Sequence, residues 1–546
     1  MKNIVKNCAI TGAEFIVDER DQRFYEKIGV PAPTLCPDER ARRRWAWRGK
    51  NFYMRKCDLC GKLAMSWFSP ELTNVTTYCQ ECFESDKWDG MDHGRDFDFS
   101  RPFFEQFAEL QRVCPRHISN SIMNENCDYI ISAHKNQNCY FTDELDGCRD
   151  CYFGYNIQYC NDIVESISVR DSELCYKVAK AENCYSIFYS QNVFGCSDSA
   201  FLVNCRACKK CLFCTNLRSK EYHVFNQPVS KEDFQKWWDF VFSGSMENLL
   251  DAEARFEEFL KQEPFPVGVL VNVEDCEGDY ISNSKNCVDS FCIDNCRDCR
   301  YCTDLHFSKD TWDVNLYEGE MQYESIHTGP KGYMQIASHL AWYSSNTFYC
   351  VELRSCDETF GCHSLKRKKH CIFNKQYSEE EYFKLKARII EHMRKTGEWG
   401  EFFPAEMSPH PYNLTMAQRF YPLGKEQVLA RGYAWLDEKD VIFETAEDHV
   451  PRTLTEMPED ILNKVYVCEN SGEKFRFVKQ ELDFYKKHGI PLPRLSPNER
   501  IEEMWRKMGP RKLHAANCRA CGGNVQTNLP NKRLIYCEKC YLKKVY

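Results

Sequence analysis

The chain has 546 residues, 34 of them cysteine, and a formal net charge of −9. Its length predicts several domains and excludes a small secreted module held together by disulfides. No apolar run approaches the ~18 residues of a membrane span, so we expect a soluble, cytoplasmic protein whose reduced cysteines bind metal or pack in the core.

The charge is divided unevenly along the chain. Residues 1–95 carry 16 basic and 14 acidic side chains, and residues 451–546 carry 19 and 11. The middle is strongly acidic, with 37 basic and 56 acidic side chains. An acidic segment repels phosphate groups and a basic segment attracts them, so any nucleic-acid contact is predicted at the two ends.

The amino-terminal segment, residues 1–95, contains a four-cysteine motif. Cys57 and Cys60 form one Cys-x2-Cys pair, and Cys79 and Cys82 form another. Two such pairs on tight turns bring four thiolates to tetrahedral distance around Zn²⁺. Four protein ligands leave no open coordination position, which predicts a structural zinc rather than a catalytic one. The same four thiolates also suit a rubredoxin-like iron centre.

A basic run precedes this motif. Residues 40–56 interleave Arg with Trp, Phe and Tyr, which is typical of a surface that binds phosphates and stacks bases. The alternative is an amphipathic helix whose arginines pair with acidic neighbours. The predicted nucleic-acid contacts in this run are Arg42, Arg43, Arg44, Trp47 and Arg48.

A linker at 96–125 leads into a cysteine-rich repeat. Twelve cysteines between residues 127 and 214 are spaced by multiples of three, and eight blocks of twelve residues run from Asn126 to Glu221. Positions 2, 5, 8 and 11 of each block are small or apolar. An inward residue at every third position fits neither a helix nor a flat strand, and it predicts a narrow β-solenoid with about twelve residues per coil at 126–229.

The solenoid cysteines have two interpretations. Stacked cysteines such as Cys127, Cys139 and Cys151 would lie ~4.8 Å apart, close enough for disulfides or a polynuclear metal site. Ile, Val, Ala and Leu replace Cys in the same columns, which favours packing of a small apolar side chain in a narrow interior. Aromatic pairs at block positions 3 and 4 form an outer stripe that could stack bases, but we expect a neighbouring helix to cover it.

The same organisation is repeated further along the chain. A helical segment is predicted at 230–273, a second β-solenoid at 274–377, and a helical segment with a linker at 378–454. Seven further twelve-residue blocks begin at Asn286. Counting Cys371 directly after them, eight of nine cysteines are at inward positions, with Cys292 as the exception. We expect the helix after each solenoid to cover its open end or side, where strand edges would otherwise be exposed.

The carboxyl-terminal segment, residues 455–546, repeats the amino-terminal one. Residues 468–505 align with residues 8–45, pairing Cys8 with Cys468 and Arg40 with Arg500, and a second four-cysteine motif follows. Its predicted zinc ligands are Cys518, Cys521, Cys537 and Cys540. Its predicted nucleic-acid contacts are Arg511, Lys512, Arg519, Lys532 and Arg533.

These segments together resemble an uncharacterised bacterial family of zinc-ribbon plus cysteine-rich repeat proteins. The strings FYEKIGVPAPTLCPDERARRRWAWR and YMRKCDLCGK and the cysteine-rich blocks carry the resemblance, which covers most of the chain. The family has no established activity, and it implies a second four-cysteine site in the first segment. Here Cys8 and Cys36 stand beside Thr11 and Glu39, and only Cys468 remains in the second copy, so we interpret these cysteines as core thiols.

No motif for phosphate binding, nucleophilic attack or metal-dependent hydrolysis is recognised, and a non-enzymatic protein is predicted. The predicted fold is mainly β with α: two β-solenoids with twelve-residue coils, flanked by duplicated zinc-ribbon or treble-clef-like modules and capping helices. The predicted function is a scaffold with two structural Zn²⁺ ions whose basic modules contact nucleic acid or a ribonucleoprotein. Two alternatives stay open: a protein-interaction or polyanion-mimicking module that uses the acidic solenoids, and a thiol-based metal or redox protein.

Overall fold

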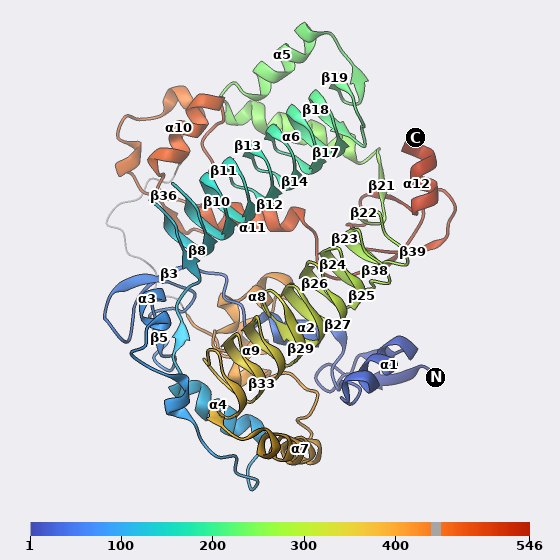
Figure 1. The fold of residues 1–546 in the computed structure, drawn as a ribbon. Helices are drawn as coiled ribbons and strands as arrows, with labels where there is room; N and C mark the ends of the chain where they lie inside the picture. Colours follow the sequence, from blue (N-terminus) through green and yellow to red (C-terminus); the bar gives the residue numbers. More distant parts are fainter. Residues whose placement is uncertain (1, 438–448, 546) are drawn as a thin grey trace.

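The computed structural model describes residues 2–437 and 449–545. The fold mixes β and α and contains two long, mostly parallel sheets, which form two arms in Figure 1 with the helices around them. Part of the predicted linker at 378–454, residues 438–448, lies outside the described residues. None of the helices in the described part of the chain is both long enough and apolar enough to cross a membrane.

The two terminal modules contain the same elements in the same order. A hairpin is followed by two helices, a second hairpin, a short strand and a last helix, so the duplication in the sequence is also a duplication of structure. In the amino-terminal module these are β1 (Ile4–Asn7), β2 (Glu14–Val17), α1 (Glu19–Ile28), α2 (Pro37–Trp45), β3 (Tyr53–Lys56), β4 (Leu63–Ser66), β5 (Thr77–Tyr78) and α3 (Gln80–Glu84). In the carboxyl-terminal module they are β36 (Tyr466–Val467), β37 (Lys474–Phe475), α10 (Lys479–His488), α11 (Pro497–Lys507), β38 (His514–Asn517), β39 (Asn524–Thr527), β40 (Leu534–Tyr536) and α12 (Glu538–Val545).

In the first sheet, all strand pairs except the last are parallel, and they join strands twelve residues apart in the chain. Cys151 lies opposite Ile163, Ile163 opposite Cys175, and Cys175 opposite Ile187, so the pairing offset is the predicted period of twelve. Eight strands, β10 to β17, close into a ring of pairings. The strands are β7 (Ser121–Ile122), β8 (Asp128–His134), β9 (Tyr140–Asp146), β10 (Arg149–Gln158), β11 (Asn161–Val164), β12 (Ile167–Arg170), β13 (Glu173–Tyr176), β14 (Ala179–Glu182), β15 (Tyr185–Phe188), β16 (Gln191–Phe194), β17 (Ser197–Arg206), β18 (Lys209–Thr215), β19 (Glu221–Val224) and β20 (Gln227–Pro228).

Left-handed backbone recurs at every third residue of this sheet. Asn138, Phe141 and Glu144 have φ of 55°, 53° and 56°, and each directly precedes a buried inward residue. Residues other than Gly, Asn and Asp rarely adopt this conformation, because their Cβ atom then lies too close to the following carbonyl oxygen. The turn at each such residue redirects the chain, which accounts for a hydrophobic period of three.

The second sheet follows the same rule with two irregularities. At its start, Leu270 lies opposite Ile281, eleven residues ahead. Thr311 lies opposite Gln322, only eleven residues ahead, and Gln322 lies opposite Gln335, thirteen ahead. The predicted unbroken twelve-residue register is therefore wrong by one residue here, because two successive residues, Leu316 and Tyr317, are left-handed. The strands are β22 (Leu270–Val271), β23 (Gly278–Ser282), β24 (Ser290–Asp294), β25 (Arg297–Arg300), β26 (Thr303–Leu305), β27 (Lys309–Tyr317), β28 (Gly319–Ile326), β29 (Gly332–Ile336), β30 (His339–Trp342), β31 (Ser345–Phe348), β32 (Val351–Arg354), β33 (Asp357–Phe360), β34 (Lys369–Ile372) and β35 (Lys375–Gln376).

Thiol groups line the interior of both sheets, and all 34 cysteines are free. Their S–H groups lie within reach of backbone carbonyls. The Sγ atom of Cys148 lies 3.2 Å from the carbonyl oxygen of Asp146 and 3.3 Å from that of Ile157 in the next coil. These contacts give the thiols polar partners within the interior, as the packing interpretation requires.

Helices cover the aromatic stripe of the first sheet. The helix α5 (Lys231–Val241) begins after the N-cap Ser230, whose side chain accepts a hydrogen bond from the backbone N–H of Asp233. Its Trp238 contacts Phe188 edge-to-face, with ring centroids 6.0 Å apart. The remaining helices and short strands are α4 (Phe103–Val113), α6 (Met246–Leu260), α7 (Glu379–Thr396), α8 (Met416–Phe420), α9 (Lys425–Ala430), β6 (Arg116–His117) and β21 (Pro264–Pro266).

Each terminal module packs on the sheet that is distant from it in sequence. In the amino-terminal module, Phe24 of α1 stacks on Trp312 of the second sheet, with ring centroids 4.1 Å apart. In the carboxyl-terminal module, Phe484 of α10 contacts Tyr176 of the first sheet at 5.8 Å. Figure 1 shows α1 beside β25 and β27, and α10 beside β11 and β13. The packing of α1 and α10 on the sheets is therefore crossed.

Candidate metal centres

The structure assembles both predicted four-cysteine clusters. In each, the four sulfur atoms lie within 4.8 Å of one another. The Sγ atoms of Cys60 and Cys79 are 3.8 Å apart, and those of Cys521 and Cys537 are 3.9 Å apart. A tetrahedral Zn²⁺ with bonds of about 2.3 Å to sulfur requires sulfur atoms about 3.8 Å apart. Both clusters therefore have dimensions that fit one tetrahedral ion.

Two matching turns position the first cysteine pair of each cluster. The backbone N–H of Gly61 donates to the carbonyl of Cys57 at 2.8 Å, and that of Gly522 donates to the carbonyl of Cys518 at 2.9 Å. Both glycines have left-handed backbone, with φ of 72° and 71°, which a glycine adopts without steric cost. The second pair of each cluster stands at the start of a helix, α3 or α12. The two hairpins and two helices thus bring the four sulfur atoms together.

The backbone around each cluster favours thiolates. Burial opposes ionisation of Cys57, but the backbone N–H groups of Cys79 and Cys60 outweigh it and lower the pKa of this thiol to about 7. The same arrangement lowers the pKa of Cys518 to about 6. Burial raises the pKa of Cys82, and the three neighbouring thiols raise this pKa further. A divalent cation would offset the repulsion among four thiolates, and it would leave no open position for a substrate.

The expected remnants of further four-cysteine sites retain the turn without the ligands. Gly12 and Gly472 have left-handed backbone like Gly61, and their N–H groups donate to the carbonyls of Cys8 and Cys468. Both of these cysteines are buried. Among residues 2–437 and 449–545, only the two four-cysteine clusters group three or more metal-ligating side chains. Cys8, Cys36 and Cys468 therefore lie outside any such group, as thiols of the core or its margin.

The amino-terminal basic run faces the interior. Arg43, Arg44, Trp47 and Arg48 are buried, and Arg42 is half-buried. Arg44 pairs with Asp313 at 3.1 Å and with Glu324 at 3.1 Å, and both partners lie in the second sheet. These side chains consequently form no exposed basic surface, and the ion-paired helix that the sequence left as the alternative describes them.

Arg48 extends this network to the first sheet. Its guanidinium lies 2.8 Å from Asp143 and over the ring of Trp67 at 4.9 Å. Burial penalises the charged guanidinium, but Asp143 and Glu144 raise the pKa of Arg48 far above its usual value. The run therefore links both sheets to the amino-terminal module.

The carboxyl-terminal predicted contacts divide into buried and exposed groups. Arg511 is buried and donates to the Sγ atom of Cys292 at 2.9 Å, which explains why this one cysteine points outward from its sheet. Lys512, Arg519 and Lys532 are exposed, and Arg533 is half-buried. Lys512 pairs with Asp38 of the amino-terminal module. Of the predicted nucleic-acid contacts, therefore, only those in the carboxyl-terminal module include exposed basic side chains.

Sequence reasoning missed the acidic partners of these arginines. Arg40 and its duplicate Arg500 are both fully buried. Arg40 lies 3.0 Å from Asp313, and Arg500 lies 2.6 Å from Glu165 and 2.9 Å from Glu481. The alignment of Arg40 with Arg500 in the two copies is visible in the sequence. Their partners Asp313 and Glu165 lie about 270 and 335 residues away in the chain, so the sequence did not identify them.

Comparisons with known proteins identify no relative. No protein-family model, no curated protein and no solved structure matches this chain. The resemblance to a family of zinc-ribbon and cysteine-rich repeat proteins therefore stays a prediction.

Proposed function

We propose that this chain is a non-catalytic, zinc-binding scaffold. Two four-thiol clusters whose sulfur spacing fits tetrahedral Zn²⁺ carry the proposal. With four protein ligands, each ion would hold the hairpins and helix of its module together rather than bind substrate. We further propose that the two sheets are β-solenoids, because each strand pairs with a strand one coil ahead and the inward side chains stack in columns.

Metal analysis of the purified full-length chain tests this proposal. We expect two zinc ions per chain, because each cluster supplies one complete set of ligands. Cys79→Ser and Cys537→Ser should each remove one ion, whereas Cys127→Ser, which changes a half-buried thiol outside both clusters, should retain both. Iron in place of zinc, or more than two ions per chain, would contradict the assignment.

We also propose that the carboxyl-terminal module contacts nucleic acid. Lys512 and Arg519 support this, because both are exposed on the module whose sequence carries the excess of basic residues. Binding through exposed cations releases counterions from the phosphates, so affinity should fall steeply with salt.

Fluorescence anisotropy of the full-length chain with a labelled single-stranded RNA tests the nucleic-acid contact. We expect binding at low salt, and the double variant Lys512→Ala/Arg519→Ala should weaken it and reduce the slope of log affinity against log salt by about 1 to 2. The matched control is Lys135→Ala/Lys209→Ala, which removes two exposed cations from the first sheet. No binding at low salt, or equal weakening by both variants, would refute the contact.

A further inference from the structure

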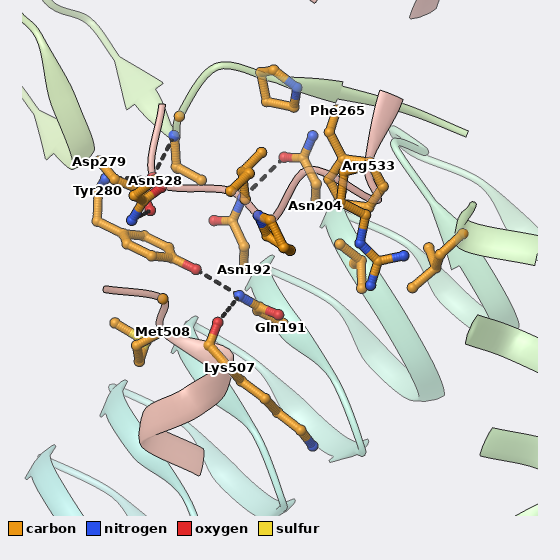
Figure 2. Close-up of a pocket in the computed structure, with 18 of the residues that line it drawn as sticks. Gln191, Asn192, Asn204, Phe265, Asp279, Tyr280, Lys507, Met508, Asn528 and Arg533 are labelled. Carbon is orange, nitrogen blue, oxygen red and sulfur yellow. Dashed lines mark hydrogen bonds between the residues drawn. The ribbon is translucent and has the colours of Figure 1, made fainter. Parts of the chain in front are cut away.

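A cavity of ≈370 Å³ lies where the first sheet, the beginning of the second sheet and the carboxyl-terminal module meet (Figure 2). Its volume falls within the range of about 300–1,000 Å³ that small-molecule sites occupy. Val203, Phe265 and Met508 supply apolar walls, and Asn192, Asn528 and Tyr280 supply polar groups. The cavity is therefore mixed in character, as ligand sites are.

The duplication provides a built-in comparison for this cavity. Asn528 stands ten residues after Cys518, as Trp67 stands ten after Cys57. Asn192 stands 24 residues before Asn216 in the first repeat, as Leu340 stands 24 before Ser364 in the second. The strand contacts agree, because Tyr536 lies opposite Pro266 where Tyr78 lies opposite His117.

The equivalent position in the other half is filled by side chains. Trp67 and Leu340 line a residual space of only ≈20 Å³. Beside them Arg116 pairs with Glu352, the counterpart of Asn204, at 3.5 Å, and the backbone N–H of His117 donates to the same carboxylate at 2.8 Å. The carboxyl-terminal half therefore has Asn528 and Asn192 at the positions of Trp67 and Leu340. These smaller side chains leave the cavity open.

A ladder of asparagine side chains ends at this cavity. The Nδ2 of Asn216 donates to the carbonyl of Pro264 at 2.9 Å, the Nδ2 of Asn204 donates to Asn216 at 2.8 Å, and the Nδ2 of Asn192 donates to Asn204 at 3.1 Å. The carbonyl of Pro264 can only accept, which fixes the direction of all three amides. Among the described residues, the Oδ1 of Asn192 then has no donor.

A second amide oxygen beside the cavity is also without a donor. Asn528 donates from Nδ2 to Asp279 at 2.9 Å and to the carbonyl of Pro510 at 3.2 Å, which orients its amide. Its Oδ1 has no donor in the described part of the chain. Asn192 and Asn528 are each 3% exposed, so water does not readily satisfy these oxygens. A buried acceptor without a partner costs free energy, and a ligand with two N–H groups would remove that cost.

Tyr280 adds a hydrogen-bond donor to the same wall. Its hydroxyl accepts from the Nε2 of Gln191 at 2.9 Å, which leaves the hydroxyl proton available (Figure 2). The cavity thus offers two amide acceptors and one hydroxyl donor. The Watson–Crick edge of guanine presents two neighbouring N–H donors beside a carbonyl acceptor. The same edge of adenine or cytosine presents only one amino group as a donor.

The rim of the cavity carries excess positive charge. Lys532 and Arg533 both pair with one carboxylate, Glu257, at 2.7 and 2.9 Å. The Nη1 of Arg533 is buried and has no acceptor among the described residues. Two cations on one carboxylate leave a net positive charge, and a guanidinium nitrogen without a partner is suited to a phosphate oxygen.

We propose that this cavity binds a guanine mononucleotide, with the base at Asn192 and Asn528 and the phosphate at Lys532 and Arg533. The proposal is independent of the nucleic-acid contact, which rests on Lys512 and Arg519. A nucleotide at the end of an RNA strand has the same chemistry as the free nucleotide, so both are tested.

Isothermal titration calorimetry of the full-length, zinc-loaded chain tests the site. We expect GMP to bind at least about tenfold more tightly than AMP, because adenine leaves one amide oxygen unpaired. Asn192→Leu and Asn528→Trp, which install the residues of the filled half, should abolish GMP binding. Lys532→Ala should weaken GMP and leave guanosine unchanged, whereas the exposed Lys543→Ala on α12 should alter neither.

Three results would overturn the proposal. The first is no GMP binding up to about 1 mM. The second is equal affinity for GMP and AMP, and the third is unchanged GMP affinity in a folded Asn192→Leu chain. The split between GMP and guanosine in Lys532→Ala keeps the test decisive if the asparagine variants fail to fold. An RNA with a terminal guanine is titrated in parallel. Its binding without binding of GMP is a case of the first result, whereas binding of GMP without RNA supports this site and refutes only the nucleic-acid contact.

Discussion

At the scale of single residues, each half of the molecule contains an equivalent buried ion pair between its terminal module and a sheet. Arg40 and Arg500 occupy equivalent places in the duplicated modules, and each reaches carboxylates of the sheet on which its module packs. Charges this deeply buried are tolerated only with close partners, because desolvation penalises them heavily. Arg40, which lies in the basic run of the amino-terminal module, and its duplicate Arg500 thus tie the modules to the sheets.

Arg500→Ala should lower the free energy of unfolding by about 3–5 kcal/mol, because it leaves Glu165 and Glu481 as buried charges without a cation. Denaturant unfolding followed by tryptophan fluorescence measures the loss. The control Lys479→Ala removes a surface pair with Asp483 and should cost less than about 1 kcal/mol. A loss of similar size in both variants would show that the buried pair does not stabilise the module.

At the scale of elements, the second sheet contains a column of buried histidines. His339 follows His327 by twelve residues, and His363 follows His339 by 24. All three side chains are buried. Burial lowers the pKa of each well below its usual value, and nearby arginines add to the effect. His410, which stacks on Phe68, has its pKa lowered to about 3 for the same reasons. The folded chain therefore holds these imidazoles neutral.

Acidification should destabilise the fold through these histidines. Between pH of about 6.5 and the lowered folded values, the unfolded chain binds protons that the folded chain excludes, so stability falls as pH falls. His327→Phe keeps the aromatic contact with Tyr317 and should flatten the decline of the melting temperature between about pH 6.5 and 4.5. The exposed His134→Phe is the control, and equal slopes for all three proteins would exclude the column as the cause.

Much of the fold was predictable at this scale because the repeat is encoded by side-chain size. The columns of Cys, Ile, Val and Ala give the twelve-residue offset, and the Cys-x2-Cys pairs followed by Gly61 and Gly522 give both metal clusters. The register shift after Leu316 was not predictable, because a change in backbone conformation produces it while the inward side chains stay compatible. The sequence offered an ion-paired helix as one interpretation of the basic run, but it could not identify the partners, since Asp313 and Glu324 are remote in sequence.

At the scale of the whole molecule, the crossed packing joins the two halves. The amino-terminal module contacts the second sheet through Asp21 and Trp312, and the carboxyl-terminal module contacts the first through Tyr485 and Glu165. The candidate nucleotide cavity exists only because this arrangement brings three segments together.

Crosslinking with a zero-length carbodiimide reagent tests the crossed arrangement. We expect crosslinked peptides joining Lys27 to Asp310, whose charged atoms are 3.0 Å apart, and Lys532 to Glu257, at 2.7 Å. Mass spectrometry of the digested monomer identifies them. Peptides linking the amino-terminal Lys27 to carboxylates of the first sheet, in place of Asp310, would contradict the packing.

The crossed packing also sets the order in which the protein can be completed during its synthesis. Glu165 and Tyr485, which meet in the finished fold, are 320 residues apart. At about 5–20 residues per second, the part of the first sheet around Tyr176, which the carboxyl-terminal module covers, waits on the order of 15–60 s for that module. During that interval this apolar surface lacks its cover and favours aggregation, and a chain that ends before the module lacks the cover altogether.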